Sequence, residues 1–125
     1  MAATKARTSI WSAQTLTAGA ADSNGSWIDL SAGYGALVDI KLTNGATGPT
    51  VAAQVQVQVA ANYNGGSPTL VTNFGGALVG GTANNGVYQF SVEIPIGAAA
   101  MRLVAGSNTG QNVTVDADIS QVTAL

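Results

Sequence analysis

The chain has 125 residues, enough for one domain, and carries a formal net charge of −2. Only 8% of its residues are charged, and it contains no His and no Cys. This composition excludes a disulfide framework, argues against nucleic-acid binding, which requires a basic face, and supplies few of the groups that catalysis uses. A hydrophobic content of 46% excludes simple disorder.

The first eight residues are polar and include Lys5 and Arg7, which are half of the chain's basic residues. We expect an N-terminal arm over residues 1–8, ahead of a single domain over residues 9–125. An ordered arm with little apolar content usually needs a partner to hold it, so Lys5, Arg7 and Trp11 are the predicted partner-binding residues. Removing residues 1–8 is expected to weaken that contact without unfolding the domain.

Eight β-strands are predicted, because apolar and polar residues alternate with a period of two along most of the chain. The clearest case is 54–59, where Gln and Val alternate, and residues 37–43, 88–94 and 113–119 repeat the pattern. Residues 68–86 fit either one strand or two. The predicted strands are 8–17, 26–31, 36–43, 51–60, 68–73, 87–95, 100–106 and 112–122.

Turns between these strands are marked by Asn-Gly at 24–25, 44–45, 64–65 and 85–86. Strands with one polar face pack as two antiparallel sheets, so the predicted fold class is an all-β sandwich, best matched by an eight-stranded jelly roll or a related topology. If successive strands run up and down, alternate connections share an end. One end then holds 18–25, 44–50, 74–86 and 107–111, and the other holds 32–35, 61–67 and 96–99.

Two acidic segments raise the question of a metal or catalytic site. Asp116 and Asp118 lie two apart on one predicted strand and share a face, as a Ca²⁺ site or an acid–base pair would require, and Asp39 or Glu93 could approach them in space. A solvated outer face is the simpler explanation. The segment 22–25, Asp-Ser-Asn-Gly, lacks the later acidic ligands of a calcium loop and is better explained as an Asx-type turn.

The remaining candidates also have simpler explanations. The glycine pairs at 75–76 and 80–81 lack the following Lys and helix of a phosphate loop, so we predict turns. Exposed aromatic side chains of Trp27, Tyr34 or Tyr63 could stack on sugar rings, whereas Trp27 could equally cap one end of the sandwich. We therefore predict no catalytic, cofactor-binding or metal-binding residue, and no enzyme.

Neither a membrane span nor export is expected. No apolar run approaches the roughly 20 residues that cross a bilayer. The first residues lack the apolar core of a signal peptide, so we expect assembly in a cytoplasm. A surface so poor in charge is typical of proteins exposed to the outside or covered in a permanent assembly. Virion proteins combine both properties, because they are built inside the host cell and exposed later.

The chain resembles the small all-β virion proteins of tailed bacteriophages, especially the jelly-roll capsid decoration or cement proteins. The resemblance covers most of the chain and concerns its general sequence pattern, without a diagnostic motif. The segments that carry it are the cationic arm and residues 25–36, 43–50, 90–96 and 101–104.

This resemblance implies a protein that binds the major capsid protein, or another virion protein, on the outer shell as a homodimer or homotrimer. Many weak contacts repeated by symmetry would then stabilise the shell. Two alternatives remain open at this point. One is a component of the tail, the baseplate or the fibre attachment, and the other is a carbohydrate-binding β-sandwich module.

Overall fold

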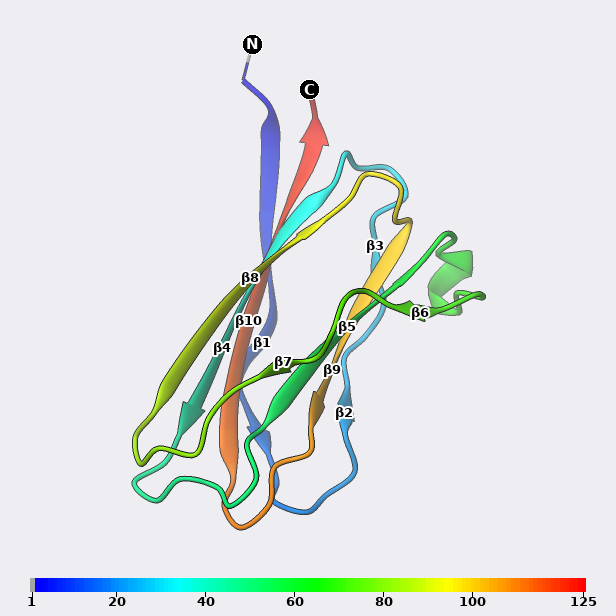
Figure 1. Ribbon diagram of the computed structural model, residues 1–125. Helices are drawn as coiled ribbons and strands as arrows, with labels where there is room; N and C mark the ends of the chain where they lie inside the picture. Colours follow the sequence, from blue (N-terminus) through cyan, green and yellow to red (C-terminus); the bar gives the residue numbers. More distant parts are fainter. Residues whose placement is uncertain (1) are drawn as a thin grey trace.

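Antiparallel strands account for most of the computed structural model, which describes residues 2–125 (Figure 1). One short 3₁₀ turn, η1 (Asn64–Gly66), interrupts them. The strands are β1 (Thr4–Leu16), β2 (Ser23–Asn24), β3 (Ile28–Asp29), β4 (Ala36–Asn44), β5 (Gln54–Ala60), β6 (Thr72–Asn73), β7 (Leu78–Val79), β8 (Val87–Ile94), β9 (Ala100–Gly106) and β10 (Val113–Ala124).

The strands form two sheets that face each other across the core. One sheet has the order β1-β10-β4-β8, and the other has the order β2-β9-β5-β6, with β3 also paired to β9 and β7 to β5. Apart from β6 and β7, which follow β5 and pair with it, neighbours within each sheet are distant in sequence, as in the Greek-key arrangement of a jelly roll. The predicted antiparallel sandwich of jelly-roll type is therefore confirmed.

Alternation along the strands builds the core as the sequence predicts. Valine side chains of β5 and alternate apolar residues of β4 point inward, while the intervening glutamines and charged residues point outward. β10 repeats the pattern. Side chains exposed by no more than 2% include those of Val38, Ile40, Leu42, Val55, Val57, Met101, Leu103, Val115 and Ile119.

Several predicted boundaries differ from the structure. β1 begins at Thr4 instead of residue 8, because it pairs with β10 from Thr4 opposite Ala124 onward. The segment 4–8 is thus continuous with the first strand, and Met1 lies outside the described residues. Of the predicted strand 26–31, only β3 (Ile28–Asp29) is formed, and β2 (Ser23–Asn24) lies in the predicted connection 18–25. Gly25 follows β2, with its backbone against that of Leu103. Residues 68–86 hold two very short strands.

Most connections gather at two ends as predicted, but 74–86 does not, because it runs along β5 and contains β7. At one end, the Gly19 amide donates to the Asn108 carbonyl over 2.9 Å and the Thr50 amide to the Thr109 carbonyl over 2.8 Å. At the other end, the Ala99 amide donates to the Ala60 carbonyl over 2.9 Å. The start of β1 and the end of β10 lie together at this second end (Figure 1).

Two buried asparagines fix the first end. The Asn44 side-chain amide donates to the Ala83 and Gly81 carbonyls over 2.8 and 3.1 Å. The Asn108 amide donates to the Leu16 and Gln111 carbonyls over 2.9 and 3.0 Å. Because buried carbonyls without a donor are costly, these amides hold the connections in place.

Close packing between the connections 45–53 and 80–86 makes Gly48 irreplaceable. A Cβ atom there would lie 1.9 Å from the Thr82 carbonyl oxygen, whereas one at Gly45 would meet nothing within 4 Å. We predict that Gly48→Ala lowers the free energy of unfolding by about 1–3 kcal/mol, as overpacking does. Urea titration of both variants tests this, with Gly45→Ala as the matched control. Equal midpoints for the two variants would contradict the prediction.

Candidate functional site

Charge is concentrated on one sheet of the sandwich. Of the ten charged side chains in the chain, seven belong to strands β1, β10, β4 and β8. They are Lys5, Arg7, Asp39, Lys41, Glu93, Asp116 and Asp118. Alternation points them away from the core, so this sheet has a charged outer face.

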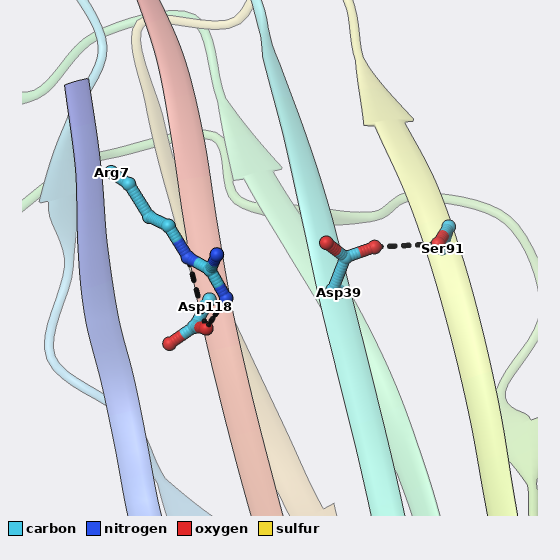
Figure 2. Close-up of polar contacts among 4 residues, drawn as sticks. All are labelled: Arg7, Asp39, Ser91 and Asp118. Carbon is cyan, nitrogen blue, oxygen red and sulfur yellow. Dashed lines mark hydrogen bonds and ion pairs between the residues drawn. The ribbon is translucent and has the colours of Figure 1, made fainter. Parts of the chain in front are cut away.

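A polar row crosses all four strands of that face (Figure 2). Arg7 on β1 reaches Asp118 on β10, with its Nε atom 3.2 Å from Oδ2 and Nη2 bonded to the same oxygen. Asp118 lies opposite Asp39 of β4 in the ladder, and the Ser91 hydroxyl of β8 donates to Asp39 Oδ1 over 2.6 Å. The row therefore places two carboxylates side by side and supplies each with a donor.

The Arg7 guanidinium responds to this contact. The hydrogen bond that Arg7 donates to Asp118, followed by the charge of that carboxylate, raises the pKa of Arg7 above its ordinary value. Arg7 is 73% exposed and the Asp118 side chain 33%. Solvent screens such a pair, so its effect is to orient the two side chains and not to stabilise the fold strongly.

Asp116 has a structural role on the same face. Its Oδ1 accepts a hydrogen bond of 2.8 Å from the Ala13 amide. Ala13 has a positive φ of 50° and lies within a register shift of β1 between Trp11 and Gln14. The carboxylate thus satisfies a backbone donor that the irregular strand cannot pair in its ladder.

The predicted face shared by Asp116 and Asp118 is present, and Asp39 joins it. These three carboxylates line one shallow hollow of about 360 Å³. Glu93 lines a separate hollow of about 660 Å³, so it does not converge with them as an acid–base site would require. Among residues 2–125, no group of His, Cys, Asp or Glu has a geometry that could hold a metal ion.

The predicted partner-binding residues occupy different surroundings. Lys5 and Arg7 are exposed on the outer part of β1, whereas Trp11 is half-buried and packs against the core. Only Leu16 of β1 is buried. The partner-binding role of Lys5, Arg7 and Trp11 stays a prediction, with Trp11 tied to the domain.

The aromatic candidates are also separated. Tyr34 is 45% exposed and lines the larger hollow together with Leu37 and Ile96. Trp27 lies on the other sheet, where the Arg102 guanidinium stacks 4.8 Å from the centre of its ring. Sequence patterns do not reveal that pair, because the two residues meet only through the pairing of β3 with β9.

The acidity of Asp29 is changed by its neighbour Ser31. The hydroxyl and the backbone amide of Ser31 both donate to its Oδ1, and they lower the pKa of Asp29 below 3.8. The ionised form therefore favours the folded state. That contribution is complete above the ordinary pKa and is lost as the pH falls through the lowered one.

We predict that Ser31→Ala moves the pKa of Asp29 back toward 3.8, because the substitution removes the Ser31 hydroxyl, whose hydrogen bond lowers that pKa most. An NMR titration of the Asp29 carboxyl carbon in both proteins measures it. Ser9→Ala, on the other sheet, is the matched control. A wild-type pKa at or above 3.8 would contradict the prediction.

No protein-family model and no curated protein matches the chain. Solved structures do. A chain of the infectious bursal disease virus VP2 subviral particle matches 97% of this chain and 32% of its own length, with 9% identity and a TM-score of 0.60. A chain from the structure of the Gx strain of that virus matches 94% of this chain and 31% of its own length, with 8% identity and a TM-score of 0.60.

The SPBc2 prophage-derived protein YomS matches over 96% of each chain, with 15% identity and a TM-score of 0.49. Of the two viral chains described above, the present chain spans only about a third of the length. At this level of identity the likeness concerns the fold: the sandwich has the architecture found in viral capsid proteins. Within residues 2–125, no helix is long and apolar enough to cross a membrane.

Proposed function

We propose that the chain is a structural virion protein that decorates the outer shell of a capsid. The observation that carries this proposal is a charge-poor jelly roll whose few charges lie mainly on one sheet. A neutral surface is inexpensive to dehydrate, so it suits permanent contact with neighbouring proteins. The viral proteins of the same fold support the proposal.

The contact that we propose for Lys5 and Arg7 lies on a ribbon formed by the ends of the chain. Residues 4–8 of β1 pair with the last residues of β10, and both are largely exposed. Lys5 has no ion pair within residues 2–125. The ribbon presents two cations beside an open strand edge, which fits an acidic neighbour on the shell.

Assembly into a homodimer or homotrimer is part of the same proposal. Symmetry repeats every contact, so that several weak interfaces act together and the total affinity exceeds that of any single one. The major capsid protein, or another virion protein, is the proposed partner. The proposed location is the virion.

Copy number tests this function directly. Quantitative mass spectrometry of particles that contain the chain should give a simple ratio to the most abundant shell protein. A few copies per particle would assign the chain to the tail, the baseplate or the fibre attachment instead. Absence from particles, combined with glycan binding that Tyr34→Ala abolishes, would favour the carbohydrate-binding alternative.

We predict that the double variant Lys5→Gln, Arg7→Gln binds shells lacking this protein roughly tenfold more weakly, mainly through slower association. Surface plasmon resonance at two salt concentrations measures both effects. Lys41→Gln, which removes a cation from the middle of the same sheet, is the control. Unchanged binding of the double variant, with an unchanged unfolding midpoint, would exclude the ribbon contact.

A further inference from the structure

The second sheet carries a hydrogen-bonded row of side chains that the proposed function has not yet used. Arg102 of β9 lies opposite Gln58 of β5, which lies opposite Asn73 of β6. Arg102 Nε donates to Gln58 Oε1 over 2.8 Å, and Gln58 Nε2 donates to Asn73 Oδ1 over 3.2 Å. Trp27 ends the row, with its ring under the Arg102 guanidinium.

The side-chain acceptors of this row are used within the row, whereas some of its hydrogen-bond donors have no acceptor. Gln58 Oε1 and Asn73 Oδ1 each already accept a hydrogen bond. Within residues 2–125, the hydrogen bonds and ion pairs assign no acceptor to either Nη atom of Arg102. A ligand of this row must therefore bring acceptors, and a carboxylate matches the two parallel Nη donors of a guanidinium.

Arg102 is also held in position before any partner arrives. The guanidinium lies over the Trp27 ring and its Nε atom donates to Gln58, so two contacts hold it in place. The side chain is half-buried. Little conformational entropy remains to be lost on binding, which is the condition under which an Arg contact contributes strongly to affinity.

The surroundings of Arg102 have the composition of an interface centre. It is the one charged residue of β5 and β9, the two central strands of its sheet. On these two strands the outward-facing residues around it are the neutral Gln54, Gln56 and Val104, and the nearest charge on the adjacent β3 is Asp29, beside Ala100. Interface centres are depleted of charge and enriched in Trp, Tyr and Arg, whereas the other sheet of this chain is rich in charge.

A carboxylate-bearing neighbour fits this face better than a second copy of the chain does. The carboxylates of β4, β8 and β10 lie on the opposite sheet, so face-to-face pairing of two copies brings none of them to Arg102. Asp29, on β3, already accepts two hydrogen bonds from Ser31 at Oδ1, which leaves only Oδ2 for the Arg102 of a second copy. A carboxylate with both oxygens available for the two Nη donors is better supplied by a different protein.

We infer that the outer face of the β2-β9-β5-β6 sheet is a docking surface for a shell protein, and that Arg102, stacked on Trp27, receives an Asp or Glu side chain of that protein. This inference rests on the proposed function and assigns its contact. The ribbon of Lys5 and Arg7 lies on the other sheet. The chain would accordingly touch the shell with two separate surfaces.

Shell binding of Arg102→Gln tests the inference. Shells lacking this protein are the probe, and we expect Arg102→Gln to bind them at least tenfold more weakly than the wild type does. The effect of salt on the contact made by Lys5 and Arg7 should be unchanged. Lys41→Gln, which also removes one cation, is the control and should bind as the wild type does. Equal affinity of Arg102→Gln and the wild type would overturn the inference while leaving the proposed function standing.

A second variant identifies the occupant and does not depend on loss of binding. Arg102→Lys places a primary amine at the same site, and a zero-length carbodiimide cross-linker joins amines only to carboxylates in direct contact. We expect a cross-link between position 102 and an Asp or Glu of the shell protein. Mass spectrometry after digestion of the complex locates it.

Three further outcomes of these experiments would overturn the inference. One is a cross-link from position 102 to a second copy of the chain. Another is binding of polygalacturonate by the wild type that Arg102→Gln abolishes while shell binding is retained, since the carboxylate would then belong to an acidic glycan. The third is failure of the wild-type chain to bind shells, which would overturn the proposed function as well. Failure of the inference alone differs from this result, because the wild type then still binds shells.

Discussion

The unbroken ladder between β10 and β4 is the constraint on which the rest of the structure depends. It runs from Val113 opposite Asn44 to Gln121 opposite Ala36 without a register shift. A slip of one residue would turn the buried valines outward and carry Asp116 and Asp118 into the core, where an unpaired carboxylate costs several kcal/mol. One register therefore fixes both the apolar core and the charged outer face.

β1 is the long exposed edge of the charged sheet, and its irregularities follow from that position. A flat thirteen-residue edge would invite pairing with another chain. Register shifts near Trp11 and the positive φ of Ala13 bend the strand, and Asp116 supplies the acceptor that the bend requires. Lys5 and Arg7 also place charge on this edge, which discourages pairing with another strand.

Local alternation makes the sandwich, its core faces and the grouping of most of its connections predictable from the sequence. Cross-strand neighbours are not predictable in the same way, because alternation says which face a residue occupies and not which residue lies beside it. Asp39 beside Asp118, and Trp27 beneath Arg102, depend on registers between strands far apart in sequence. The start of β1 at Thr4 escaped prediction because residues 4–8 are exposed on both faces, so no apolar alternation marks them.

The two outer faces differ in what it costs to cover them. Covering the face of Asp39, Asp116 and Asp118 would remove water from several charges that already have partners, and a new protein contact would have to replace that hydration. Covering the face around Arg102 removes water from amides, from one guanidinium whose Nη donors still lack acceptors and, at the edge formed by β3, from Asp29. The second process leaves less charge to compensate, and it offers one strong directional contact. The charged sheet is consequently the better surface to leave in water, with contact limited to its projecting ribbon, and the neutral sheet is the better surface to bury.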